Sequence, residues 1–284
     1  MNAPADLFSA PGILVAYDGS ADSDNAARWA GETAASSGET VTALIVVDPV
    51  DMPRGRPWPE QWWQEMEGRA RARLTDAGAS AVRVERRKGP TTATLVEAAQ
   101  SASALVIGSR GHSRVGEFLL NSVSQSAARQ ARCPVVVVRA PKDGASRRVV
   151  VGVDGSEPSL RALDYACRHA ALAHDPVSVV RAWKPGTVPV DVHGEIPTSL
   201  STSVAHEEAI LDDIVARSRA AHPTITIEAD FMATGPGNAL VDASAHAHLV
   251  VVGAQGMTAL QEAVLGSVSQ HVLRHAHCTV AVVH

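Results

Sequence analysis

The sequence has 284 residues, of which 45% are hydrophobic, and this is the length of about two globular domains with ordinary packed cores. Its net charge is −5 at pH 7 and its basic residues form no long run, which argues against nucleic acid as a partner. No apolar run approaches the ~20 residues of a membrane-spanning helix, and the N-terminus lacks a signal-peptide pattern, so we expect a soluble cytoplasmic protein with no membrane partner.

Short apolar segments alternate with helical patterns along the first half of the chain. The first strand candidate, residues 13–17, ends at Asp18-Gly19-Ser20 and leads into an alanine-rich helix over 26–35. The strand candidates are continuous runs of Val, Ile and Leu, which are typical of a parallel sheet covered on both faces. The other main elements of this half are expected at 41–47, 60–77 and 105–107.

The second half of the chain repeats this pattern. Asp154-Gly155-Ser156 also follows an apolar strand, and its offset from the first copy is 154 − 18 = 136 residues, the size of a duplicated domain. The offset grows to 253 − 108 = 145 between Gly108 and Gly253, which places extra residues between the second and third strands, within 184–200. We therefore expect two domains, residues 1–140 and 147–284, with a short linker between them. Two like folds on so short a tether are expected to pair about a pseudo-two-fold axis.

A glycine-rich loop follows the fourth strand of each copy. The common phosphate motifs G-x-x-x-x-G-K-[ST] and G-x-G-x-x-G are absent. The recurring spacing is instead Gly, two residues, Gly, nine residues, then Gly-Ser, which is complete at Gly253, Gly256, Gly266 and Ser267. Glycine lets the backbone approach a phosphate, and the following helix start supplies unpaired amides, so we expect phosphate here, with the Ser267 hydroxyl capping the helix.

With these motifs in view, the chain resembles a tandem universal stress protein of the ATP-binding kind. The resemblance covers nearly the whole chain twice and includes the Asp-Gly-Ser turns, the pairs Gly89-Pro90 and Gly235-Pro236, and a closing strand after a Cys. It implies an α/β fold of two tandem three-layer αβα domains, each with a five-stranded parallel sheet of order 3-2-1-4-5. The last strand of each sheet would be available for pairing the domains as a pseudo-dimer.

The resemblance also implies the ligands and the site. ATP and Mg²⁺ are the expected cofactors, and the expected partners are an adenine nucleotide, a second tandem chain in a homodimer, and a regulatory protein not yet known. Second-strand residues would offer backbone groups to adenine, and the ends of the first strands would line the pocket floor. The cofactor-binding residues expected from the motifs and the resemblance are Ala16, Asp18, Val46, Gly108, Ser109, Arg110, Gly111, Asn121, Ser122 and Val123 in the first copy, and Gly152, Asp154, Ala182, Gly253, Ala254, Gln255, Gly256, Gly266, Ser267 and Val268 in the second.

Asp18 and Asp154 have two interpretations. By the resemblance, each would serve ribose or a Mg²⁺ that lies between its carboxylate and the phosphates. Alternatively, each caps a turn, because Asp-Gly-Ser is also a favourable turn sequence. We favour the first interpretation.

The first copy departs from the motif because Asn121 replaces its third glycine. Asparagine is a good helix N-cap, so the amides can still face an anion, but its side chain fills space that glycine leaves open. We therefore expect both copies to bind, with the first copy weaker. Arg110 and Arg114 either offset that loss by contacting phosphate or are simply exposed loop residues.

The cysteines and histidines predict no metal centre. Cys133, Cys167 and Cys278 form no C-x-x-C pair and are expected to be small buried residues. His271 and His275 lie four apart on the last helix, but without convergent further ligands. Trp58, Trp62 and Trp63 could stack on a base, although we favour their closing a core or an interface.

No pattern of a nucleophile with a base, or of a residue that positions water at a γ-phosphate, occurs in the sequence, so we assign no catalytic residue. This favours an ATP-binding regulator of stress response or growth over an efficient enzyme. The alternatives are a slow Mg²⁺-dependent ATPase and a sensor of another adenine nucleotide, such as AMP or a cyclic nucleotide.

Overall fold

The computed structural model of the protein describes residues 12–51, 58–110, 122–140, 146–183, 198–256 and 265–284. The chain divides into two compact units, Met1–Ala140 and Pro141–His284. Each unit is an α/β domain with its own parallel sheet, as the sequence predicts.

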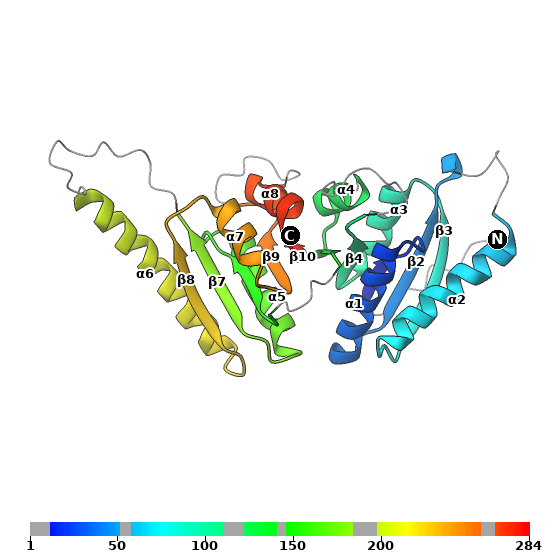
Figure 1. Cartoon of the computed structure of the whole chain (residues 1–284), viewed down its shortest axis with the longest axis horizontal. Coiled ribbons are helices and arrows are strands. Elements are labelled where there is room, and N and C mark those ends of the chain that lie inside the picture. The colour runs from blue at the N-terminus through cyan, green and yellow to red at the C-terminus, as the bar shows by residue number, and fades with distance from the viewer. Residues whose placement is uncertain (1–11, 52–57, 111–121, 141–145, 184–197, 257–264) are drawn as a thin grey trace. The chain divides into compact units, whose positions relative to one another are not determined.

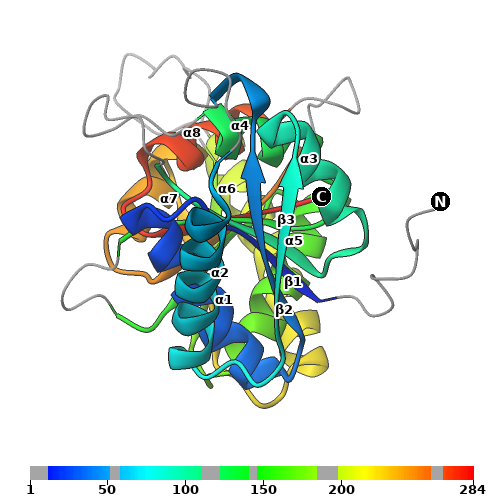
Figure 2. The same cartoon turned by 90° about the vertical axis from the view of Figure 1, so that its right-hand side faces the viewer.

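The first domain has the sheet order β3-β2-β1-β4-β5, and all its neighbouring strands run parallel. This is the predicted order 3-2-1-4-5. Helices α1 and α2 cover one face of the sheet, and α3 and α4 cover the other, which gives three layers (Figures 1 and 2). Its elements are β1 (Ile13–Ala16), α1 (Ala21–Ser37), β2 (Val41–Val47), a short 3₁₀ turn (Pro49–Asp51), α2 (Glu60–Asp76), β3 (Val82–Lys88), α3 (Thr91–Ala98), a second 3₁₀ turn (Ala99–Ser101), β4 (Ala104–Gly108), α4 (Ser122–Gln130) and β5 (Val135–Val138).

The second domain repeats this arrangement in the order β8-β7-β6-β9-β10, again all parallel. Helices α5 and α6 pack on one side of the sheet, and α7 and α8 pack on the other. Its elements are β6 (Val149–Gly152), α5 (Glu157–Ala171), β7 (Val177–Ala182), α6 (Thr198–Ala221), β8 (Ile227–Met232), α7 (Pro236–Ser244), β9 (Leu249–Gly253), α8 (Ser267–His275) and β10 (Thr279–Val283). Of the predicted insertion at 184–200, residues 184–197 lie outside the described part, and α6 begins at Thr198.

Burial explains why the strands form where they do. Every residue of β4, β5, β9 and β10 is buried, because helices cover both faces of these strands. Edge strand β3 instead has only exposed and half-buried residues, and five of its seven residues are charged. All three cysteines are buried, as expected from their positions.

Serine caps fix where the first helix of each domain begins. The Ser20 hydroxyl accepts a hydrogen bond from the Ser23 amide at the start of α1, and Ser156 accepts one from Ser159 at the start of α5. Helix α1 therefore begins at Ala21, five residues before the predicted start at 26. The Asp-Gly-Ser segments thus connect strand to helix directly.

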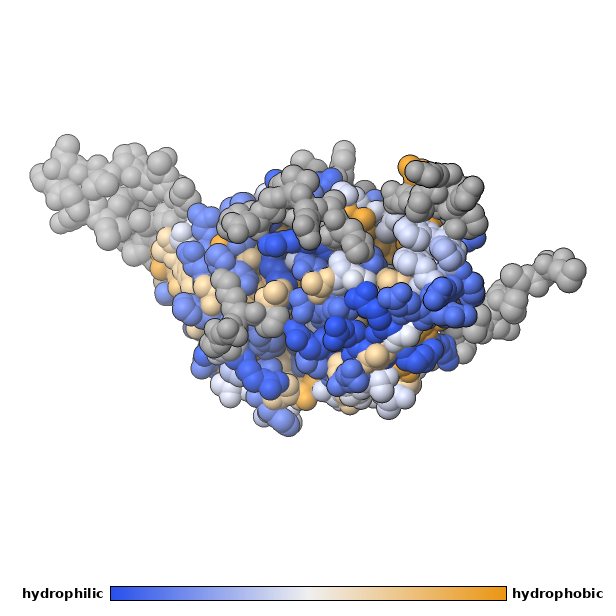
Figure 3. All heavy atoms as spheres, turned by 45° about the vertical axis from the view of Figure 1, so that its right-hand side comes forward, coloured by the Kyte–Doolittle hydropathy of each residue, from blue (hydrophilic) through white to orange (hydrophobic). Residues whose placement is uncertain are grey.

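The described residues expose few large hydrophobic side chains. In the orientation of Figure 3, hydrophilic residues dominate, with smaller apolar areas between them. Among the described residues, the large hydrophobic side chains that are exposed are Val50 and Leu160. Trp63 is buried, which agrees with a role in closing the core. The rings of Trp58 and Trp62 stack with their centroids 4.6 Å apart. The described helices include none that is long and apolar enough to cross a membrane.

Candidate functional site

The predicted site residues lie near the point where the strand order of each sheet reverses. Strand β1 pairs with both β2 and β4, and β6 pairs with both β7 and β9. The connections leave such neighbouring strands in opposite directions, and ligands bind in the crevice at their carboxyl ends. Two predicted residues, Ala16 and Gly152, end the first strands, and Gly108 and Gly253 end the fourth strands.

The Asp-Gly-Ser turns of the two domains have the same local geometry. Asp18 Oδ1 accepts hydrogen bonds from the Ser20 amide at 2.9 Å and the Ser20 hydroxyl at 2.6 Å. Asp154 Oδ1 accepts the equivalent bonds from Ser156, at 2.9 and 2.5 Å. The central glycines have φ values of +80° and +90°, where a side chain would be strained. One oxygen of each aspartate therefore stabilises the turn, which is the second of the two interpretations of these residues.

The other oxygen of Asp154 faces the glycine-rich loop. A Cβ atom placed on Gly256 would lie 2.6 Å from Asp154 Oδ2, closer than atoms can approach without a shift. Any side chain at Gly256 would therefore displace either the loop or the aspartate. The fold thus brings together a carboxylate and a loop backbone that the sequence analysis assigned to the site separately.

The fourth strand ends against the first helix in both domains. A Cβ on Gly253 would lie 3.0 Å from the Pro158 carbonyl oxygen, and one on Gly108 would lie 2.8 Å from the Asp22 carbonyl oxygen. Neither glycine has a positive φ, so close packing of backbone on backbone, and not an unusual conformation, requires glycine here.

The start of α8 differs in detail from the prediction. Gly266, with φ −60° and ψ 154°, is the N-cap, and no side chain of the described residues caps the helix. Ser267 is the first helical residue and is exposed, so the expectation that its hydroxyl caps the helix is wrong. The reason is register: the hydroxyl lies one residue too far along the chain. The first amides of α8 are therefore not capped by a side chain.

Two buried serines that the sequence analysis missed hold the loop ends in place. The Ser269 hydroxyl donates to the Gly253 carbonyl at 2.6 Å, and the Ser124 hydroxyl donates to the Gly108 carbonyl at 3.0 Å. A signal was present, because Ser-Val-Ser-Gln occurs in both copies, at 122–125 and 267–270. Each bond ties the end of the fourth strand to the first turn of the fourth helix across the glycine-rich loop.

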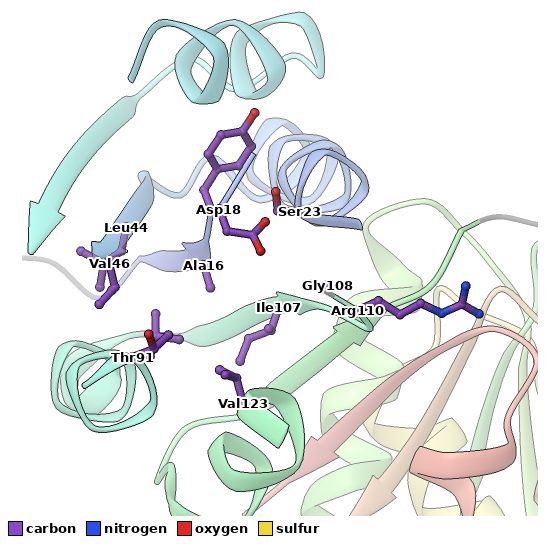
Figure 4. Close-up of a pocket in the computed structure, with 12 residues that line it drawn as sticks. Ala16, Asp18, Ser23, Leu44, Val46, Thr91, Ile107, Gly108, Arg110 and Val123 are labelled. Carbon is purple, nitrogen blue, oxygen red and sulfur yellow. The ribbon is translucent and has the colours of Figure 1, made fainter. Parts of the chain in front are cut away.

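In the first domain, a pocket opens at the carboxyl ends of β1, β2 and β4 (Figure 4). In that view, Asp18 points into the space beside Ala16, whereas the Arg110 side chain extends away from it. Six predicted residues line the pocket: Ala16, Asp18, Val46, Gly108, Arg110 and Val123. The sequence analysis missed the lining residues Tyr17, Ser23, Leu44, Thr91, Leu95 and Ile107. Leu44, Leu95 and Ile107 look like ordinary core positions in a sequence, and Tyr17, Ser23 and Thr91 belong to no binding motif.

A sequence profile of the universal stress protein family matches the chain twice, over residues 12–139 and 145–284. The chain belongs to the universal stress protein family. It is similar to universal stress protein Rv2005c of Mycobacterium tuberculosis (strain ATCC 25618 / H37Rv), with 34% identity over 290 residues that cover 95% of this chain and 96% of that protein. A universal stress protein of Mycolicibacterium smegmatis is 32% identical over 291 residues, covering 96% of both chains.

Solved structures show the same two-domain fold. A universal stress protein from Archaeoglobus fulgidus DSM 4304 matches with a TM-score of 0.69 at 20% identity, covering 96% of this chain and 97% of that chain. A universal stress protein described as putative, from Pseudomonas aeruginosa UCBPP-PA14, matches with a TM-score of 0.66 at 18% identity, covering 97% and 94%. At these identities the similarity shows the fold alone.

The remaining predicted residues of this universal stress protein take varied positions. Ser109 is buried, and its hydroxyl donates to Asp22 Oδ2 at 2.8 Å, while Ser122 is exposed at the start of α4. Ala254 is buried with its amide bonded to Val283 O, whereas Gln255 and Val268 are half-buried. Ala182 is the last residue of β7. Gly111, Asn121 and Arg114 lie outside the described residues.

The described residues offer no ready-made metal site at these aspartates. Within the described ranges, no group of three or more His, Cys, Asp or Glu side chains converges as a metal site would require. A cation at Asp18 or Asp154 would therefore need further oxygen ligands from a bound phosphate or from water, which is the usual coordination of Mg²⁺ in nucleotide sites.

Proposed function

We propose that this universal stress protein binds ATP with Mg²⁺ in both domains, more tightly in the second, and acts as a nucleotide-dependent regulator of stress response or growth. The observation that supports this most directly is the contact between Asp154 Oδ2 and Gly256 beside the uncapped start of α8. A carboxylate, a closely approachable loop backbone and a helix start without a side-chain cap in the described residues thus lie at one end of the sheet.

The phosphate chain would lie along the loop and the first turn of α8. Helix amides without partners, together with the helix dipole, attract an anion at this end. The starts of α1 and α5 are less suited to binding phosphate, because the Ser20 and Ser156 side chains already cap these helices. The carboxylate of Asp154 would repel phosphates directly, so a Mg²⁺ between them reconciles the two charges.

The adenine ring would occupy the apolar part of the pocket. In the first domain, Leu44, Val46, Leu95, Ile107 and Val123 supply aliphatic surface for the faces of a flat base, and Thr91 adds a hydroxyl. The neighbouring Asp18 turn leaves the ribose and phosphates at the polar end. This polarity along the pocket is what a nucleotide requires.

We expect the two domains to differ in nucleotide affinity because of the loop surface that faces the ligand. In the second domain, a Cβ on Gly266 would meet nothing closer than the Ala254 carbonyl oxygen at 3.5 Å, an ordinary contact. A backbone of this kind accepts asparagine without strain, so Asn121 would weaken binding by occupying ligand space rather than by misfolding. We place the protein in the cytoplasm as a homodimer of tandem chains with a regulatory protein partner.

Isothermal titration with MgATP, AMP and cyclic AMP tests this function. Wild type should bind MgATP most tightly, and Asp154→Ala and Gly256→Glu should each abolish one site. The exposed Asp212→Ala on α6 is the matched control for loss of a carboxylate and should bind as wild type. Turnover is measured in parallel: multiple turnovers that both variants reduce and the control does not would make the protein an ATPase. Tighter binding of AMP or cyclic AMP would change the assigned ligand.

A further inference from the structure

An arginine guanidinium lies beside the central glycine of the Asp-Gly-Ser turn in each domain, but it comes from different elements. A Cβ placed on Gly19 would lie 3.5 Å from Arg69 Nη1, and a Cβ placed on Gly155 would lie 3.7 Å from Arg181 Nη1. Arg69 belongs to helix α2, whereas Arg181 belongs to strand β7. The sequence repeat does not show this correspondence, because the residue 136 positions before Arg181 is Ile45.

Strand geometry places Arg181 on the face away from the expected adenine position. Successive strand residues point to opposite faces of a sheet. In the first domain, Leu44 and Val46 line the pocket, so Ile45 between them faces the other side, where it is buried. Arg181 takes this position in the second domain and meets Glu207 of α6 there. It therefore reaches the turn from the side opposite to the adenine pocket.

The two arginines differ in environment. Arg69 has a side chain 43% exposed, donates to the Gly19 carbonyl at 3.1 Å, and lies 3.5 Å from Asp24 Oδ2. Arg181 has a side chain only 7% exposed and contacts Glu207 Oε2 through Nε at 2.7 Å and Nη2 at 2.5 Å. Its Nη1, which faces Gly155, is buried and has no hydrogen-bond partner in the described part of the chain.

The buried charge of Arg181 interacts more strongly with nearby groups than the exposed charge of Arg69. Water and salt screen an exposed guanidinium, whereas a buried one keeps its field over a longer distance. Glu207 neutralises part of this charge and fixes its position, but Nη1 remains directed at the turn. A buried arginine with one unpaired nitrogen is unfavourable on its own, which indicates a role beyond packing.

We propose that Arg181, held by Glu207, is a positioning residue of the second nucleotide site: it supports the Asp154-Gly155-Ser156 turn and so keeps Asp154 against Gly256. Arg69 does the same from α2 in the first domain. The inference rests on the proposed nucleotide site and adds that the second site depends on a buried ion pair to α6, whereas Arg69 of the first site pairs with Asp24 of α1 and is more exposed.

The test uses the full chain with charge-removing and charge-keeping variants. Arg181→Met alone would leave Glu207 without its partner, so Arg181→Met with Glu207→Met is the main variant, because an apolar pair usually replaces a buried ion pair without loss of the fold. Arg181→Lys keeps the charge, and Arg69→Met is the matched variant of the first domain. Two-site titrations with MgATP and with adenosine give the dissociation constants.

The double variant is expected to weaken MgATP binding about tenfold at the second site and adenosine binding less than twofold, because only the phosphates and Mg²⁺ depend on Asp154. Arg181→Lys should stay within about threefold of wild type, and Arg69→Met should affect the first site only. Equal losses for MgATP and adenosine would mean a merely structural role and would overturn the proposal, as would unchanged MgATP binding.

Amide hydrogen exchange separates this inference from the proposed function, since it needs no ligand. In the double variant, exchange at residues 154–156 should accelerate while residues 18–20 stay as in wild type, and Arg69→Met should give the reverse. If wild type binds no adenine nucleotide, the proposed function fails, and exchange alone decides whether Arg181 positions the turn. Unchanged exchange in the double variant would overturn the positioning role.

Discussion

Asp154 combines two roles through its two oxygen atoms. Oδ1 accepts both bonds from Ser156 and fixes the turn that starts α5, while Oδ2 faces Gly256 in the loop. The two interpretations of the Asp-Gly-Ser sequence are therefore compatible, because a turn that locks one oxygen also aims the other. A preorganised carboxylate of this kind loses little entropy when a ligand binds.

Gly256 and Gly266 are predicted to differ sharply in their tolerance of a methyl group. Gly256→Ala would place Cβ 2.6 Å from Asp154 Oδ2, whereas Gly266→Ala would meet Ala254 O at 3.5 Å. Overpacking of this kind costs about 1–3 kcal/mol, so Gly256→Ala should weaken MgATP binding at the second site about tenfold. Gly266→Ala strains no protein contact and fills less ligand space than asparagine would, so it should weaken binding only about twofold. Similar affinities for the two variants in calorimetry would contradict the predicted contact.

His169 is predicted to make the second domain less stable in mild acid. Burial, and then the nearby His248, lower the pKa of His169 to about 4, below its usual value near 6.5. The unfolded chain therefore binds a proton between these values that the folded chain does not, so stability is full above pH 6.5 and falls as the pH approaches 4.

Urea unfolding of wild type and His169→Gln at several pH values checks this prediction. The carboxylates contribute equally to both proteins, so the difference between their free energies of unfolding isolates the histidine. Wild type should lose stability relative to the variant from pH 6.5 to 4. A difference that is constant with pH would show that His169 keeps an ordinary pKa.

At the scale of single residues, the sequence predicts those candidate site residues that can be identified from their type and spacing alone. Asp154, Gly253 and Gly256 are recognisable because a carboxylate after a strand and glycines at fixed spacing are rare by chance. Arg181 and Leu44 are not recognisable, because their roles come from tertiary contacts: an arginine in a strand or a leucine in a core gives no signal of a site.

At the scale of elements, the connection between the fourth strand and the fourth helix is the most informative. Ser269 and Ser124 each tie the helix back to the strand that precedes the loop. Because these bonds are buried, they fix the distance between the two ends of the loop. The start of α8 therefore keeps a fixed position relative to the end of β9.

Removal of the Ser269 hydroxyl is predicted to destabilise the second domain. Ser269→Ala leaves the buried Gly253 carbonyl without this donor, which should reduce the free energy of unfolding by about 1–3 kcal/mol. Ser267→Ala, two residues earlier and exposed, should change it by less than about 0.5 kcal/mol. Urea unfolding followed by circular dichroism measures both, and equal effects would show that the Ser269 bond contributes nothing specific.

Element positions are predictable here to the extent that burial determines them. Continuous Val and Ile runs predict the central strands because both faces of those strands are covered. The start of α1 is predicted late, since Ser20 caps a first turn of polar residues that has no apolar periodicity.

At the scale of the whole molecule, two domains of one fold carry similar turns and different supports. Both have the Asp-Gly-Ser turn, the close approach of the fourth strand to the first helix, and the buried serine. They differ at Asn121, at the insertion and at the arginine beside the turn, so duplication has kept the backbone of the site while its surroundings diverged. Pairing of the domains about a pseudo-two-fold axis stays a prediction.

The measurement that tests the central claim most directly is native mass spectrometry of the purified chain titrated with MgATP, alongside its Asp18→Ala and Asp154→Ala variants. The account predicts up to two bound nucleotides per chain. Asp154→Ala should lose the nucleotide that binds at the lower MgATP concentration, and Asp18→Ala should lose only the one that binds at the higher concentration. A wild-type chain that binds no nucleotide would contradict the assignment of both sites. Retention in Asp154→Ala of the nucleotide that binds at the lower concentration would contradict the assignment of the tighter site to the second domain.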